Sequence, residues 1–216
     1  MTTCEKHIDS NKSQKQHNFI EAKIAIRAVI LGFIIGLSSI GSFHVNFSQL
    51  TMYFGFLSLF HFLEFWITAL YNPLNVSISV QAFLFSNGSQ YILAHCFTIL
   101  EYLLEYLFFP QIKMYKFISY VGFVITCMGQ ICRSLSMIHA TQNFSHKISL
   151  KKTKDHVLVT DGIYRWIRHP SYFGFFFWAI GSQIMLINPI STIVHMIILW
   201  VFFSRRIRYL AKFIFH

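Results

Sequence analysis

Long apolar runs, separated by short polar segments, constrain this chain more than any other feature. A helix of about 20 apolar residues can cross the roughly 30 Å hydrocarbon layer of a bilayer. Four runs have about that length: residues 24–43, 50–71, 91–109 and 115–138. The sequence therefore predicts four transmembrane helices before residue 139.

The composition agrees with a membrane protein of several spans. Hydrophobic residues make up 55% of the chain and charged residues only 12%, whereas about 25% are charged in an ordinary soluble domain. The formal net charge is +10, but the basic residues flank apolar runs and do not form one solvated basic face, which argues against a nucleic-acid-binding protein. We predict an all-α fold, a polytopic transmembrane helical bundle with about six membrane segments.

The last two of these segments are short. Residues 172–187 and 190–203 are apolar and are joined by Asn188-Pro189, which predicts a short helical hairpin. A basic loop at 140–170 precedes the hairpin, and a basic tail follows it. Short loops rich in Lys and Arg stay in the cytosol, so we expect this loop, the tail and the N-terminus on the cytosolic side. Residues 1–18 are polar, and we expect them to be disordered.

Lys113 and Lys116 are an exception to this charge pattern, because their loop would face the lumen. Ionisable residues within the apolar runs are a second unusual feature: Glu64, Glu101, Glu105 and Arg133. Each is costly in a membrane and is a candidate functional residue by default. The alternative is that they pair with one another, and Arg133 could then neutralise the two glutamates that lie one helical turn apart. The four cysteines have no metal-ligand spacing, so we predict no metal site.

Residues 156–174 hold the densest set of chemically active side chains. Two His, two Tyr, two Arg and one Asp lie within these 19 residues, at a predicted membrane boundary. Asp161-Gly162 is typical of a turn, and Pro170 suits the first turn of a helix. Backbone N–H groups at such a helix start can bind an anionic or polar ligand. An interfacial segment with snorkelling side chains is the alternative that composition leaves open.

The pattern in this segment resembles a known family. It reads His156-x-Leu-Val-x-x-Gly-x-Tyr-x-x-x-Arg-His-Pro-x-Tyr-x-Gly and is followed by Asn188-Pro189. This resembles the S-adenosylmethionine-binding core of isoprenylcysteine carboxyl methyltransferases, and the fungal members most closely. Further segments are similar to the transmembrane half of that family: Ser58-Leu59-Phe60-His61-Phe62-x-Glu64, Asn72-Pro73, Asn87-Gly88-Ser89-x-Tyr91, Gly129-Gln130-x-Cys132-Arg133 and Asn143-Phe144-Ser145-His146. The resemblance runs from about residue 24 to about residue 208.

The resemblance implies a methyltransferase of the endoplasmic reticulum membrane with its active site facing the cytosol. Members methylate the C-terminal carboxylate of prenylated cysteine in CaaX-processed proteins, with S-adenosylmethionine as the methyl donor. The expected partners are therefore prenylated proteins or peptides and membrane lipid. The positions that match the family's cofactor-binding residues are His156, Val157, Leu158, Val159, Tyr164, His169, Pro170, Ser171 and Tyr172.

Arg206 matches the arginine that faces the substrate carboxylate in this family. A carboxylate is already ionised at pH 7, so the reaction needs no general base. It needs proximity and the exclusion of water, and the planar guanidinium of Arg matches a carboxylate. We therefore expect Arg206 to be the catalytic residue.

Two positions depart from the family pattern. Ser149 stands where many members have Gln, and Leu210 stands where the family has a Glu that contacts the cofactor. No acidic residue follows Asp161. We therefore expect a divergent or truncated C-terminus, which would reduce or abolish catalysis if nothing else replaces the missing carboxylate.

Three alternative functions stay open at this point. A phospholipid N-methyltransferase could share the cofactor site, although an amine acceptor would favour an acidic group over Arg206. A membrane sterol reductase would need NADPH, and the chain has no Gly-rich dinucleotide signature. A truncated, non-catalytic prenyl-binding membrane protein is the third. In each case the chain divides into a polar cytosolic N-terminus (1–23), a four-helix transmembrane region (24–138) and a third region (139–216). With the family's function, this third region is the cofactor-binding catalytic part, with its hairpin and basic tail.

Overall fold

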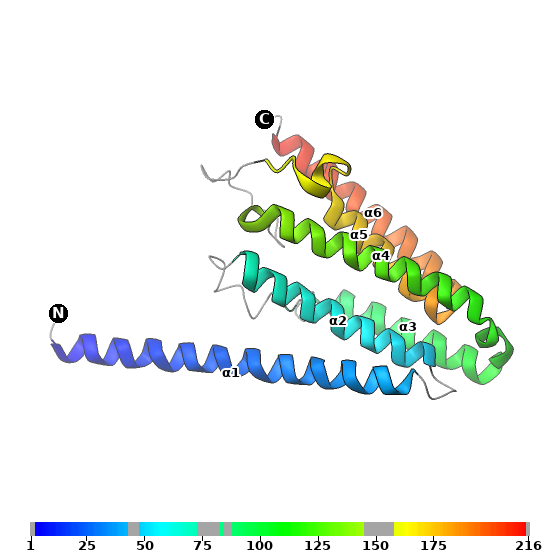
Figure 1. The fold of residues 1–216 in the computed structure, drawn as a ribbon, viewed down its shortest axis with the longest axis horizontal. Helices are drawn as coiled ribbons and strands as arrows, with labels where there is room; N and C mark the ends of the chain where they lie inside the picture. Colours follow the sequence, from blue (N-terminus) through cyan, green and yellow to red (C-terminus); the bar gives the residue numbers. More distant parts are fainter. Residues whose placement is uncertain (1–2, 43–47, 73–82, 84–87, 145–157, 215–216) are drawn as a thin grey trace.

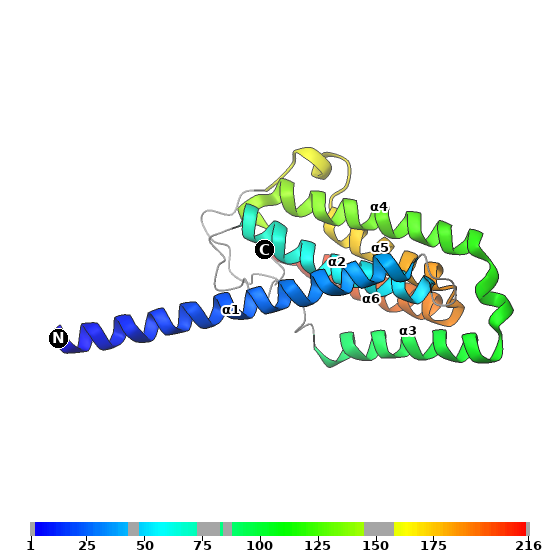
Figure 2. The ribbon, with the colours of Figure 1, turned by 60° about the horizontal axis from the view of Figure 1, so that its bottom comes forward.

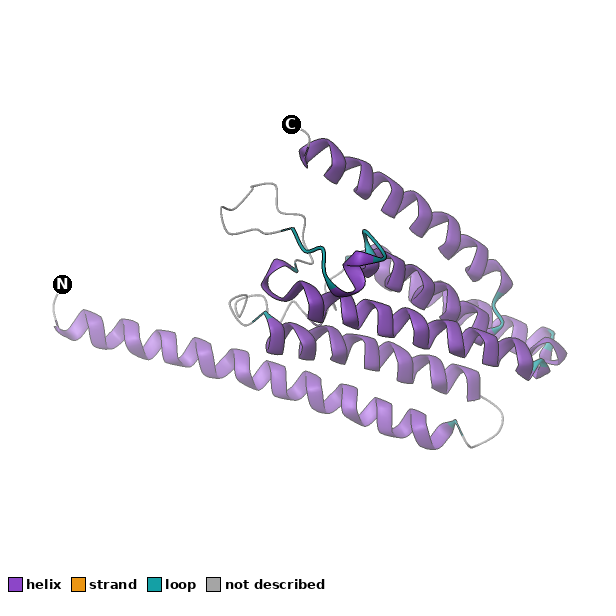
Figure 3. Ribbon diagram, turned by 45° about the horizontal axis from the view of Figure 1, so that its top comes forward, coloured by secondary structure: helices purple, strands orange, loops and turns teal. Residues whose placement is uncertain are grey.

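The computed structural model describes residues 3–42, 48–72, 83, 88–144 and 158–214. Within these ranges the chain forms α-helices and short 3-10 helices and no strand (Figure 3). The α-helices are α1 (Thr3–Gly41), α2 (Ser48–Tyr71), α3 (Ser89–Phe108), α4 (Lys116–Ala140), α5 (Pro170–Leu186) and α6 (Pro189–Ile214). The 3-10 helices are η3 (Pro110–Met114), η4 (Thr141–Asn143) and η5 (Gly162–Arg165). The predicted all-α fold class is confirmed.

Five of the helices are long and apolar enough to cross a membrane. Their apolar stretches are Asn18–Gly41, Ser48–Tyr71, Ser89–Phe108, Lys116–Asn143 and Pro189–Leu210. The sixth helix, α5, has 17 residues and is therefore about 26 Å long. The predicted hairpin forms from α5 and α6, but α6 continues through the basic residues after Ser204 and is longer than its apolar run.

The prediction of disorder for residues 1–18 is wrong from Thr3 onward, because α1 begins there and runs for 39 residues. The polar stretch before residue 24 contains no Gly and no Pro, so nothing in it interrupts a helix that has started within the apolar run. Figures 1 and 2 show this part of α1 extending beyond the rest of the bundle.

The helices alternate in direction, which places the basic segments together. The N-terminus, residues 158–169 and the C-terminal part of α6 lie at one end of the bundle (Figure 1). We call this the basic end. Residues 109–115 and the α5–α6 turn lie at the opposite end, which we call the hairpin end. This arrangement agrees with the orientation that the basic segments predict, although Lys147, Lys151, Lys152 and Lys154 lie outside the described residues.

Glycines bring α4 and α5 into close contact. Gly122 and Gly129 on α4 face Gly174 and Gly181 on α5, and a Cβ atom at any of them would lie within 3 Å of a backbone atom of the facing helix. Small residues allow such an approach between membrane helices, where dispersion contacts and hydrogen bonds drive association. The contact places the start of α5 against Arg133 of α4, because Gly174 packs on the Arg133 backbone.

Candidate active site

The described site residues gather at the basic end, around the start of α5. His156 and Val157 lie outside the described residues, as does Ser149. Leu158 is 81% exposed, and Val159 is partly buried. The chain then turns at Asp161 and enters η5.

The η5 turn packs on the last turn of α4. Gly162 has a φ of +61°, and a Cβ atom there would collide with the His139 ring. The Ile163 N–H donates to His139 Nδ1 (3.2 Å), and the Tyr164 hydroxyl donates to the Ser136 carbonyl (3.2 Å). Burial raises the pKa of the Tyr164 phenol, so this hydroxyl stays protonated at neutral pH. The turn is therefore held in a defined position beside α5.

The start of α5 is held by a buried ion pair. Arg133 binds Glu64 of α2 through two bonds, Nε to Oε1 (2.6 Å) and Nη2 to Oε2 (3.0 Å). Its third nitrogen, Nη1, donates to the Ser171 carbonyl (3.3 Å) and to the Ser171 hydroxyl. Ser171 follows the buried Pro170, the first residue of α5. One guanidinium therefore ties α2 and α4 to the segment that resembles a cofactor site.

An aromatic column links this segment to α6. The His169 and Tyr172 rings stack with their centroids 5.7 Å apart, and the Tyr172 and Phe203 rings stack at 4.9 Å. The Arg206 guanidinium lies over the Tyr172 ring, 5.3 Å from its centroid, and 5.8 Å from that of Phe202. The fold thus places Arg206 beside the sequence motif that precedes it by more than 30 residues.

The electrostatics of the column follow from its partial burial. Burial, together with the positive charge of Arg168, lowers the pKa of His169, so its imidazole is neutral at pH 7. Ring faces attract cations, and a guanidinium binds a carboxylate through two parallel hydrogen bonds. The column can therefore receive a cationic group on its rings and an anionic group at Arg206.

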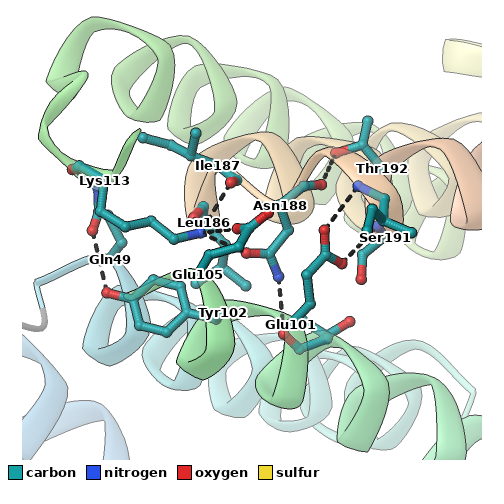
Figure 4. A network of polar contacts seen from close by, with 12 residues as sticks. Gln49, Glu101, Tyr102, Glu105, Lys113, Leu186, Ile187, Asn188, Ser191 and Thr192 are labelled. Atoms are coloured by element: carbon teal, nitrogen blue, oxygen red, sulfur yellow. Dashed lines mark hydrogen bonds and ion pairs between the residues drawn. The ribbon is translucent and has the colours of Figure 1, made fainter. Parts of the chain in front are cut away.

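The other two glutamates of the apolar runs, Glu101 and Glu105, lie at the hairpin end, beside Lys113 and the α5–α6 turn (Figure 4). Glu105 binds Lys113 (2.5 Å), and Glu101 accepts the backbone N–H groups of Ile190 (2.8 Å) and Ser191 (2.7 Å). The predicted pairing of Arg133 with Glu101 or Glu105 is therefore wrong. Glu101 and Glu105 lie one turn apart but have separate partners, which relieves their repulsion.

Sequence reasoning missed Phe203 as part of the site. It precedes Arg206 by one helical turn on α6, so helical spacing could have placed the two residues on one side of the helix. Leu210 lies one turn beyond Arg206, within α6. Its side chain has no hydrogen-bonding group, so it cannot replace a carboxylate.

The family comparison matches the part of the chain that holds the candidate site. Residues 120–214, which include most of α4, the η5 turn and both hairpin helices, match the model of the isoprenylcysteine carboxyl methyltransferase family. The protein-S-isoprenylcysteine O-methyltransferase of Saccharomyces cerevisiae is 43% identical over 199 residues, which cover 89% of this chain and 82% of the yeast protein. The chain belongs to the isoprenylcysteine carboxyl methyltransferase family.

Two further comparisons, with a human protein and with a solved structure, support the family relationship. The human protein-S-isoprenylcysteine O-methyltransferase is 40% identical over 185 residues, which cover 85% of this chain but only 64% of the human protein. A solved structure of the eukaryotic intramembrane Ras methyltransferase of this family is 32% identical, with a TM-score of 0.82. That match covers 96% of this chain and 77% of the solved one. The family's membrane architecture therefore extends over nearly the whole chain.

Proposed function

We propose that this multi-pass membrane protein transfers a methyl group from S-adenosylmethionine to the C-terminal carboxylate of a prenylated cysteine in CaaX-processed proteins. The observation that carries the proposal is the position of Arg206, a carboxylate-binding guanidinium that lies over the Tyr172 ring of the family motif. The names of the yeast and human relatives support the same reaction. The proposed location is the endoplasmic reticulum membrane, with the basic end in the cytosol.

The residues of the basic end fit such a methyl donor. S-adenosylmethionine supplies an electrophilic methyl group on a positively charged sulfur. The stacked rings of His169 and Tyr172 offer faces that attract a cation. Tyr164 and Ser171 hold the η5 turn and the start of α5 against α4, and the exposed Leu158 side chain offers an apolar surface. These residues, with Val159, Pro170 and the undescribed His156 and Val157, are the proposed cofactor-binding set.

Arg206 has the task of holding the acceptor. The carboxylate is ionised at neutral pH, so no residue has to remove a proton. Arg206 orients the carboxylate, and Phe202 and Phe203 beside it reduce access of water. Orientation and exclusion of water can together supply much of the rate acceleration in a methyl transfer to an anion.

The surface of α6 suits an acceptor with an apolar tail. Ile197, Ile198, Val201 and Phe202 line an open apolar groove along this helix, and the groove ends at Arg205, Arg206 and Tyr209. A prenylcysteine has the same polarity along its length, an apolar chain that ends in a carboxylate. The prenyl chain can reach the groove sideways from the bilayer, while the peptide part stays at the basic end.

A phospholipid amine is a poorer acceptor for this geometry. A protonated amine would be repelled by the Arg206 cation. Glu64, the buried carboxylate whose partner Arg133 binds Ser171 at the start of α5, has both oxygens bound to Arg133. This arrangement favours an anionic acceptor over an amine.

A methyl-transfer assay with paired acceptors tests the proposal. The full chain in phosphatidylcholine vesicles receives radiolabelled S-adenosylmethionine and either N-acetyl-farnesylcysteine or its carboxamide. We expect a base-labile methyl ester from the free acid and no product from the carboxamide. Base-stable methylation in vesicles that contain phosphatidylethanolamine would indicate the amine-methylating alternative. Saturable binding of farnesylcysteine without any transfer would indicate the non-catalytic one.

A further inference from the structure

Arg206 lies on a helix, α6, of which one face packs on α5 and the outer face is largely exposed. Much of the outer face of α6 is exposed, including Ile193, Ile197 and Trp200. Lipid chains are as apolar as these side chains, so burial against lipid does not favour one register of the helix over another. The position of α6 along α5 therefore depends on its ring contacts with α5 and on a few directional hydrogen bonds.

The strongest directional contacts lie at the first turn of α6. Asn188 is its N-cap residue, and an N-cap Asn usually accepts an N–H of its own first turn. Here Asn188 Oδ1 accepts from Lys113 Nζ (3.0 Å) instead, and Asn188 Nδ2 donates to the Thr98 carbonyl (2.9 Å). The Asn188 side chain therefore binds other elements, and the N–H groups of the first turn of α6 need a different acceptor.

Glu101 of α3 is that partner. Its two oxygens accept the N–H groups of Ile190 (2.8 Å) and Ser191 (2.7 Å), the second and third residues of α6 (Figure 4). The carboxylate also faces the positive end of the helix dipole. A cap supplied by a different helix fixes both the height and the rotation of α6, because two adjacent N–H groups must meet two oxygens at once.

Lys113 stabilises the other half of the turn. Its ammonium group donates to the carbonyls of Leu186 and Ile187, each at 2.9 Å, where α5 ends. A cation at the negative end of one helix dipole and an anion at the positive end of the next hold the hairpin turn to η3 and α3. The turn is therefore anchored to a part of the bundle outside the hairpin.

We propose that Glu101 is a positioning residue for Arg206, an inference that rests on the proposed function of Arg206. The helix is continuous from Ser191 to Arg206, about 22 Å at 1.5 Å per residue. A slip of one residue would rotate Arg206 by about 100° away from the Tyr172 ring. Glu101 thus sets the guanidinium in place from the opposite end of the helix.

Glu101→Gln tests the inference, because it keeps the shape of the side chain but can accept only through one oxygen and carries no charge. We expect kcat/KM for N-acetyl-farnesylcysteine to fall by about 10-fold or more. The KM for S-adenosylmethionine should change by less than about 2-fold, because the η5 turn and the start of α5 are held by α4 and not by α6. Ile193→Ala, an exposed change near the same end of α6, is the matched control and should leave both values unchanged.

A double-mutant cycle with Arg206→Lys separates positioning from general destabilisation. If Glu101 acts through Arg206, its loss should cost far less when the guanidinium is already absent. Equal costs in both backgrounds, or an unchanged kcat/KM in Glu101→Gln alone, would overturn the inference. An inactive wild type would instead refute the proposed function. If Glu101→Gln does not fold, Glu101→Asp enters the same cycle, because it keeps the charge and shortens the reach to α6.

Discussion

The two ends of the bundle both bury charged residues, but they use them differently. At the basic end, Arg133 binds Glu64 side chain to side chain and joins the faces of three helices. At the hairpin end, Glu101 and Lys113 bind mainly backbone groups where α6 begins and α5 ends. A side-chain pair fixes which helix faces meet, whereas a bond to a helix end fixes where that helix starts or stops. We infer that the first arrangement contributes mainly to stability and to the cofactor segment, and the second to the placement of α6.

The largest expected effect comes from breaking the pair at the basic end. Arg133→Met leaves Glu64, which is 1% exposed, without its cation. Removal of one partner of a buried pair costs about 3–5 kcal/mol, to be measured by reversible unfolding in detergent. Glu64→Leu combined with Arg133→Met should recover part of this loss, because no buried charge then remains. A loss below about 1 kcal/mol in the single variant would contradict the stabilising role.

A smaller loss is expected at the hairpin end. Lys113→Met removes the donor to two carbonyls and to Glu105. A hydrogen bond to a charged group contributes about 1.5–3 kcal/mol, and the contributions of one group's several bonds are not additive. We expect the free energy of unfolding to fall by about 2–3 kcal/mol. Lys116→Met is the control, since Lys116 is exposed and lies only three residues away. Equal stability of the two variants would show that Lys113 does not hold the turn.

The close approach of α4 and α5 gives the next effect. In Gly174→Ala the new methyl group meets the Arg133 backbone, so the helices must separate, at a cost of about 1–3 kcal/mol. Gly32→Ala places the same group where no atom lies within 4 Å and should be neutral or slightly stabilising. Thermal unfolding of both variants would check the difference. An unchanged melting temperature for Gly174→Ala would show that the contact between α4 and α5 can relax.

The smallest expected effect is a shift of a pH profile. Because burial and Arg168 lower the pKa of His169, its protonation opposes the folded column. Activity should therefore decline as pH falls through the lowered pKa of His169, which lies below the ordinary histidine value of about 6.5. Arg168→Gln removes the like charge and should move this acid limb to higher pH by less than about one unit. A profile of kcat/KM between about pH 5 and 8 measures the shift. An acid limb at the same pH in Arg168→Gln would show that the Arg168 charge does not lower the pKa of His169.

The sequence predicted the helices better than their partners. The apolar runs place α2, α3 and α4 within a few residues of their observed bounds, because a membrane span requires a minimum length. The partner of Arg133 is 69 positions away at Glu64, and no spacing rule indicates which helices are adjacent. The sequence places Lys113 in a loop and gives no sign that it is buried. It is buried because it binds the carbonyl groups at the end of α5, and no sequence pattern shows that this turn lies beside it.

The candidate site was predicted from the motif and not from the fold. The resemblance supplied His169, Tyr172 and Arg206, and the structure brings these three together. The stack with Phe203 could not be derived from the motif, because it depends on the register of α6 against α5. The functions of these residues remain predictions, and His156 and Val157 lie outside the described residues.

The most direct test compares two arginines of α6. Arg206 is partly buried over Tyr172, whereas Arg208 is exposed and does not line the apolar groove. Methyl transfer from S-adenosylmethionine to N-acetyl-farnesylcysteine should fall by about 100-fold or more in kcat/KM for Arg206→Ala. Arg208→Ala should stay within about 3-fold of the wild type, because an exposed charge outside the groove contributes little. Equal losses in the two variants would contradict a specific carboxylate site at Arg206 and indicate a diffuse effect of the basic tail.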